Sequence, residues 1–138
     1  MNKGVKNDYS RFGLRSYDVM LAEELGAKWY NITPKGRCQC LINDKGETLV
    51  KVERKESSYP GYGTSYLPMY VHKMEPASQA LETMSGRGYT WRASYDKNGY
   101  SVILVDHEHG TEFSANNQLT MPKAITIAIL KATGRIEI

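Results

Sequence analysis

Two strand-like segments joined by a tight turn place the firmest limit on how this chain can fold. In residues 89–96, aromatic or small side chains alternate with polar ones, which is the period of a half-buried β-strand. The turn Lys97-Asn98-Gly99 then leads into residues 100–106, so the two segments predict an antiparallel hairpin. Residues 102–105 are apolar without alternation, which favours a strand buried on both faces. We therefore expect this strand to lie centrally, with a layer on each side.

Three segments carry helix signals. Residues 16–25 begin at a serine that can cap free amide groups and end before Gly26. Residues 74–84 have Pro76 in the first turn and one apolar stripe at helical spacing. Residues 121–133 follow Thr120, a possible cap, and end at Gly134. Nearly every position of this last segment is apolar or small, which predicts a deeply packed helix.

Shorter strands are expected at residues 29–32, 37–43 and 48–54, and the last two are joined by a turn in which Gly46 supplies a positive φ. Residues 111–115 can add an edge strand. The predicted order is therefore α-β-β-β-α-β-β-(β)-α. Three helices around a mainly antiparallel sheet indicate an α+β fold of the α/β/α sandwich type.

Three segments of the chain match the pattern of a known family. They are Leu25-Gly26-Ala27-Lys28-Trp29, the Leu67-Pro68-x-Tyr70 segment that leads into residues 74–84, and the closing helix with its Ala124-Ile125-x-x-Ala128-x-Leu130-Lys131-Ala132-x-Gly134 pattern. With this layout the chain resembles the phage ABA sandwich domain, a family of small phage and prophage proteins. The resemblance implies the α/β/α fold and a phage setting, and it brings no catalytic residues with it.

Length and composition narrow the class of protein. The 138 residues fit one domain. We expect residues 16–138 to form it and residues 1–15 to be a basic, flexible arm. No apolar run approaches the ~20 residues of a membrane-spanning helix, and the first residues lack a signal-peptide segment. Cys38 and Cys40 would point the same way in a strand, without the geometry of a disulfide, so free thiols are expected. These features predict a cytoplasmic protein of the host cell.

The formal charge of +3 comes from the N-terminal half. Up to residue 70 there are eleven Lys and Arg against eight Asp and Glu, and after it seven against seven. This excess offers a possible phosphate-binding set, made up of Lys3, Lys6, Arg11, Arg15 and Lys51. A charge of +3 is small for a nucleic-acid-binding protein. The simpler interpretation of the terminal cations is a solvated, frayed end of the chain.

His107-Glu108-His109 is the run in which metal-ligand residue types lie closest together. Zinc needs three or four convergent donors, and the remaining candidates are His72, Cys38 and Cys40. A solvated connection between strands is the favoured interpretation, so we expect no metal site and no cofactor. Neither cysteine has a histidine base placed beside it by the sequence, and no other catalytic constellation is visible. The chain is therefore not expected to be an enzyme.

Tyrosines gather in an irregular segment. Residues 55–69 hold too many Gly, Pro and Ser residues for a regular element, and four of the ten tyrosines fall within residues 59–70. Tyrosine with serine and glycine is typical of binding loops, and its ring can also stack on bases. The alternative is that the rings simply cover the edge of a sheet. The predicted partner-binding set is Tyr59, Tyr62, Tyr66, Tyr70, Arg54 and Lys55.

These sequence features are compatible with three hypotheses about function. The leading hypothesis is a phage accessory protein that binds a host protein stoichiometrically, as an inhibitor of an antiviral defence component of the anti-defence or anti-CRISPR type. The second is a nucleic-acid-binding phage accessory protein, in which the basic residues contact phosphates and the tyrosines stack on bases. The third is a protein that sequesters a small nucleotide signal in a pocket lined by Tyr89, Trp91 and Arg92.

Overall fold

The computed structural model describes residues 9–32, 38–53, 61–63 and 66–138. The helices are η1 (Tyr9–Arg15), which is a 3-10 helix, α1 (Ser16–Glu24), α2 (Met74–Gly86) and α3 (Met121–Ala132). The strands are β1 (Lys28–Asn31), β2 (Cys38–Ile42), β3 (Thr48–Glu53), β4 (Gly61–Gly63), β5 (Tyr89–Asp96), β6 (Gly99–Asp106) and β7 (Thr111–Gln118).

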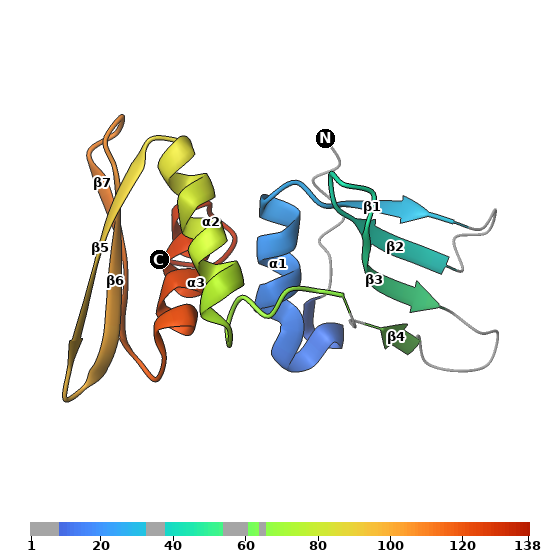
Figure 1. Ribbon diagram of the computed structural model, residues 1–138, viewed down its shortest axis with the longest axis horizontal. Helices are drawn as coiled ribbons and strands as arrows, with labels where there is room; N and C mark the ends of the chain where they lie inside the picture. The colour runs from blue at the N-terminus through green and yellow to red at the C-terminus, as the bar shows by residue number, and fades with distance from the viewer. Residues whose placement is uncertain (1–8, 33–37, 54–60, 64–65) are drawn as a thin grey trace.

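The described strands form two antiparallel sheets, one with the order β1-β2-β3-β4 and one with the order β5-β6-β7. The helices lie between them, with α2 and α3 against the second sheet and α1 toward the first (Figure 1). The predicted α+β class, the antiparallel pairing and the order of the main elements are confirmed. The short strand β4 is an addition, because the segment that contains it was expected to be irregular.

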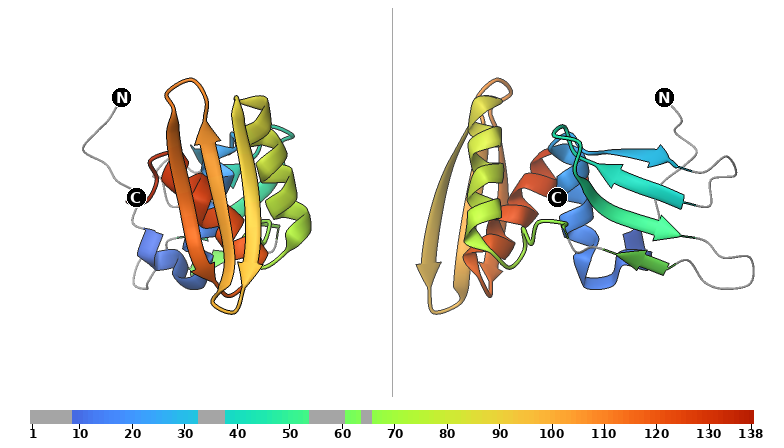
Figure 2. Two further views of the ribbon diagram at one scale, coloured as in Figure 1. Left: turned by 90° about the vertical axis from the view of Figure 1, so that its left-hand side faces the viewer. Right: turned by 45° about the vertical axis from the view of Figure 1, so that its right-hand side comes forward.

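The layers are arranged differently from the expected single sheet between helices. Val102 and Leu104 of β6 are buried against the helices, whereas Ile103 and Val105 point to the other face and are half-buried. No described element covers that outer face (Figure 2). β-branched side chains favour a strand even where it is only half-covered, so the unbroken apolar run overstated the burial of β6.

Helix α3 is buried on nearly all sides, as predicted. Its side chains from Pro122 to Leu130, with the exception of Lys123, are buried, because the helix lies between α1 and the strands β6 and β7. The hydroxyl of Thr120 accepts a hydrogen bond from the backbone N–H of Lys123 at 3.4 Å, which confirms the predicted N-cap. None of the helices in the described part of the chain combines the length and the apolar character that a bilayer crossing requires.

Residues 9–15 were assigned to a flexible arm, and the structure corrects this boundary. They form η1, in which Phe12 is buried and stacks on Trp29 with the ring centroids 6.0 Å apart. The guanidinium of Arg11 lies over both rings, 4.7 Å from the centroid of Phe12 and 5.7 Å from that of Trp29. Residues 1–8 lie outside the described residues.

A buried ion pair fixes the chain segment before α2. Asp18 of α1 is fully buried and accepts a hydrogen bond from Nε of Arg15 at 2.7 Å. Its second oxygen accepts from the backbone N–H of Val71 at 3.0 Å, and the Arg15 guanidinium also donates to the carbonyl of Leu67 at 2.6 Å. Arg15 at the end of η1 and Asp18 in α1 thus hold a backbone segment more than fifty residues further along the chain.

The other end of α1 carries a second polar network. The indole N–H of Trp29 donates to Glu23 at 2.7 Å, and Arg135 donates to Glu23 at 3.0 Å and to Glu24 at 3.1 Å. Arg87, just after α2, donates to Glu24 at 2.9 Å. These two adjacent carboxylates therefore join α1 to β1, to the end of α2 and to the C-terminal segment.

Candidate partner-binding surface

A cavity of about 470 Å³ opens on the four-stranded sheet beside the tyrosine-rich segment. The pairing of β3 with β4 contributes to it, because this pairing sets Lys51 opposite Gly63 at the end of the sheet. The absence of a side chain at Gly63 leaves room next to Lys51. The described residues that line the cavity are Glu47, Thr48, Leu49, Lys51, Gly63 and Tyr66.

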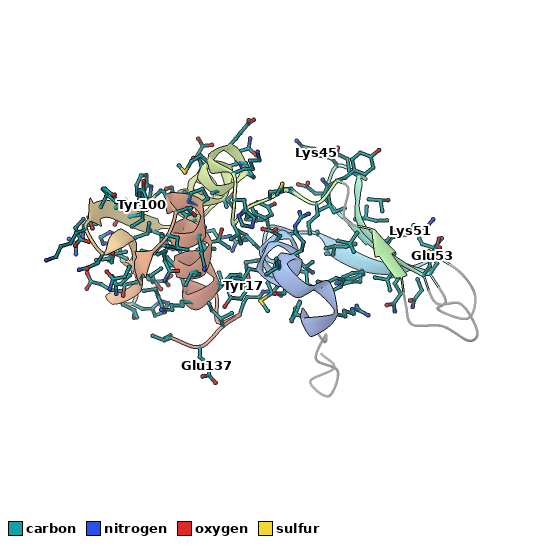
Figure 3. All side chains as sticks on the ribbon, turned by 90° about the horizontal axis from the view of Figure 1, so that it is seen from below. Tyr17, Lys45, Lys51, Glu53, Tyr100 and Glu137 are labelled. Atoms are coloured by element: carbon teal, nitrogen blue, oxygen red, sulfur yellow. The ribbon has the colours of Figure 1, made fainter. Side chains whose placement is uncertain are left out.

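The cavity combines an exposed ring with an apolar floor and charged edges. The side chain of Tyr66 is 78% exposed, whereas Leu49 is buried. Nζ of Lys51 lies 2.9 Å from a carboxylate oxygen of Glu53, and this hydrogen bond raises the pKa of Lys51, so the amine is a cation at neutral pH. Lys51 and Glu53 project together at the outer end of the sheet (Figure 3). An accessible aromatic ring beside a polar rim is typical of a protein-binding hot spot.

The structure places only part of the predicted partner-binding set. Tyr66 lines the cavity. Tyr62 lies in β4, and the position of its side chain is outside what the structure describes. Tyr59, Arg54 and Lys55 also lie outside the described residues. Tyr66 is therefore the member of this set whose side chain the structure places, exposed, at the cavity.

Tyr70 is a core residue, which corrects its assignment to the binding surface. Its side chain is only 7% exposed, and the hydroxyl of Thr126 in α3 donates to its backbone carbonyl at 3.0 Å. Burial, together with the negative charge of Asp18, raises the pKa of Tyr70 to about 12. The ring packs inward because both α1 and α3 bind the segment that carries it.

The raised pKa of Tyr70 predicts a loss of stability in strong base. The folded state favours the neutral phenol, so its contribution is fully present below the ordinary pKa of 10.0 and is lost as the pH rises toward 12. Denaturant titrations over this range should show the free energy of unfolding falling more steeply for the wild-type protein than for Tyr70→Phe. If the free energy of unfolding falls equally with pH in the two proteins, the phenol of Tyr70 is not buried as the structure shows.

The predicted phosphate-binding set is not brought together as one patch in the described structure. Arg11 lies over the Phe12 and Trp29 rings, Arg15 is held by the buried Asp18, and Lys51 is paired with Glu53. Lys3 and Lys6 lie outside the described residues. The described cations of this set are therefore engaged in contacts within the protein.

The candidate metal ligands lie apart in the structure, with His107 and His109 in the turn between β6 and β7, His72 before α2, and both cysteines in β2 of the other sheet. Nε2 of His107 is 2.6 Å from the Thr90 hydroxyl. Nδ1 of His109 is 2.8 Å from a carboxylate oxygen of Asp106, and this contact raises the pKa of His109 and lowers that of Asp106. Cys38 and Cys40 are buried in β2 and are not joined in a disulfide, as predicted. Within the described ranges, no group of three or more His, Cys, Asp or Glu side chains is arranged to hold a metal ion.

The proposed nucleotide pocket is not formed as expected. Trp91 and Tyr89 lie on the face of β5 that faces the helices, whereas Arg92 lies on the opposite face. Arg92 instead approaches Glu112 across the sheet, with a nitrogen–oxygen distance of 3.4 Å. The aromatic rings therefore lack the cation that was expected to accompany them.

Comparison with known proteins relates the chain to a phage protein by its fold. No family model matches the sequence, and no curated protein matches it. The structure is similar to the crystal structure of a phage protein from Bacillus cereus, with a TM-score of 0.51 and 20% sequence identity. The match covers 90% of this chain and 89% of that chain, so the two share a fold over nearly their whole length. The resemblance to the phage ABA sandwich domain stays a prediction.

Several residues of the cavity were not identified from the sequence. Glu47, Thr48 and Leu49 follow a hairpin turn and carry no binding signal of their own. Gly63 was counted only as a breaker of regular structure. Their common location depends on the pairing of β3 with β4, which the local sequence pattern does not indicate.

Proposed function

We propose that this protein is a phage accessory protein that acts by binding a host protein stoichiometrically in the cytoplasm, without catalysing a reaction. The proposed class of partner is a component of a host antiviral defence system, whose activity the bound protein blocks. The cavity that presents Tyr66 beside Lys51 is the observation that carries the proposal, because it offers an anchor for a protein surface.

Two further observations support a binding role. The fold is similar to that of a phage protein over nearly the whole chain. The cations expected to contact phosphates are engaged with other groups of the protein where the structure describes them, which favours a protein partner over a nucleic acid. A pull-down from host lysate, analysed by mass spectrometry with and without nuclease, tests this choice. Recovery that depends on nucleic acid would contradict the proposal.

Tyr66→Ala is expected to weaken binding to the captured partner by about 2 kcal/mol or more, as truncation of an aromatic hot spot does. Because Tyr66 is 78% exposed, the melting temperature of the Tyr66→Ala variant should stay close to that of the wild-type protein. Isothermal titration calorimetry and thermal unfolding of the same samples measure the two properties separately.

Tyr95→Ala is the matched control, because Tyr95 is also an exposed tyrosine, at 68%, but belongs to the other sheet. It should leave the affinity for that partner unchanged. If Tyr95→Ala weakens binding and Tyr66→Ala does not, the partner binds the three-stranded sheet and the assignment to the cavity is wrong.

A further inference from the structure

The three-stranded sheet ends, at β5, in an edge that no other described strand covers. Among the described strands, β5 pairs only with β6, and all of its residues except Tyr89 are exposed. Asp96 and Gly99 are paired across a two-residue turn, so they exchange backbone hydrogen bonds. Hydrogen-bonded and non-hydrogen-bonded positions alternate from there. Trp91, Ala93 and Tyr95 therefore direct their N–H and C=O groups away from β6, to the open edge.

An apolar groove of about 340 Å³ runs along this edge. Trp91 and Ala93 of β5 form one wall, and Ile125 of α3 is part of the floor. The side of α2 contributes Met74, Leu81 and Glu82. Trp91 is 48% exposed and Met74 47% exposed, so the groove presents apolar surface to solvent.

The groove exists because α2 extends beyond the β5 edge of the sheet. Figure 2 (left) shows α2 lying beyond β5, on the side where the sheet has no described strand. A strand added next to β5 would continue the sheet over α2 and close the groove. The side chains of such a strand that face the helices would then pack against Met74 and Leu81.

We propose that the β5 edge is a second binding site, which takes an extended peptide segment of a partner protein as a fourth strand of this sheet. The open N–H and C=O groups require an occupant with an extended backbone, as in other cases of β-strand addition. The groove requires apolar side chains at alternate positions of that peptide.

A charged residue at the groove indicates which side chains this peptide should carry. Glu82 is exposed at the groove and forms no ion pair with the described residues. A lysine or arginine of the bound segment would pair with this carboxylate. A second copy of the chain fits less well, because pairing two β5 edges about a twofold axis would bring both copies of α2 beneath the junction (Figure 2). The occupant is therefore an alternating apolar segment with a basic residue.

Selection of a random-peptide display library on the immobilised protein tests this site, with peptides at least as long as the 8 residues of β5. The enriched peptides should carry apolar residues at alternate positions and a lysine or arginine. In hydrogen exchange, the amides of Trp91, Ala93 and Tyr95 should exchange rapidly in the free protein and become protected when a selected synthetic peptide binds. The amides of Arg92 and Ser94, which face β6, should be protected in both states.

Two variants make the test specific. Ala93→Pro removes one outward N–H and leaves the pairing with β6 intact, and it should weaken peptide binding about tenfold. Glu82→Lys leaves the backbone unchanged and should reverse the preference from basic to acidic peptides. Arg92→Ala, on the opposite face of the same strand, is the control and should leave the affinity unchanged. If Ala93→Pro fails to fold, Glu82→Lys and the exchange pattern decide.

The proposal is overturned if no alternating pattern is enriched, or if the selected peptides have the three- and four-residue spacing of a helix. Equal affinity for the wild-type protein and a folded Ala93→Pro variant also overturns it. Protection of the outward amides in the protein alone, together with a dimer in size-exclusion chromatography, would assign the edge to a second copy instead. None of these outcomes depends on Tyr66, so this test and that of the proposed function can fail separately.

Discussion

Asp18→Ala is expected to destabilise the protein by about 3–5 kcal/mol, which is the range for breaking a buried ion pair by removing one partner. The substitution leaves the Arg15 guanidinium without the carboxylate that lies 2.7 Å away and leaves the N–H of Val71 without its acceptor. Because Arg15 also donates to the carbonyl of Leu67, the segment before α2 should loosen as well. Denaturant titration measures the loss.

Two comparisons separate the causes of this effect. Asp18→Asn keeps an oxygen that can accept from Val71 but removes the charge opposite Arg15. Its free energy of unfolding should therefore lie between that of the wild-type protein and that of Asp18→Ala. Arg92→Ala removes one partner of an exposed pair and should cost no more than about 1 kcal/mol. If Asp18→Ala is no more harmful than Arg92→Ala, the buried pair does not stabilise the fold.

Ile129→Ala should cost about 2–5 kcal/mol, because Ile129 in α3 is fully buried and its truncation removes apolar contacts and leaves a cavity. The matched control is Lys131→Ala, two positions along the same helix. Nζ of Lys131 donates to the carbonyl of Ser114 at 2.8 Å, so its removal should cost about 1 kcal/mol.

Equilibrium unfolding in denaturant, with circular dichroism as the signal, compares the two variants. Equal losses would mean that α3 is packed less tightly than the structure shows. The double variant Asp18→Asn/Ile129→Ala tests whether α1 and α3 stabilise each other through the segment that contains Tyr70, since both helices bind that segment. If they do, the loss in the free energy of unfolding of the double variant will differ from the sum of the two single losses.

The two proposed binding sites lie at opposite ends of the molecule. The Tyr66 cavity lies on the four-stranded sheet, the β5 groove lies beside the three-stranded sheet, and the helix layer separates them (Figure 1). One protein could therefore contact a partner surface at one end and a peptide segment at the other. Because the two sites are far apart, the free-energy changes caused by a substitution at one site and a substitution at the other are expected to add.

The kind of each main element was determined by the sequence itself, because helix and strand periods are properties of neighbouring residues. The nearly unbroken apolar character of residues 121–132 required a helix covered on most sides, and the alternation in residues 89–96 required a strand. The spacing of Cys38 and Cys40 in a strand predicted thiols on one face that are not joined in a disulfide.

Only the tertiary structure decided how these elements are layered and which tyrosine is exposed. Tyr66 and Tyr70 are four positions apart within the tyrosine-rich residues 59–70, yet Tyr66 is 78% exposed and Tyr70 is 7% exposed. The difference arises because Asp18 and Thr126 bind the backbone around Tyr70 from positions more than fifty residues away in the sequence. The division of the strands into two sheets was also decided at this level. Every described pairing joins strands that follow one another in the chain, so the local pattern fits one sheet as well as two, and the two sheets are separate because the helices pack between them.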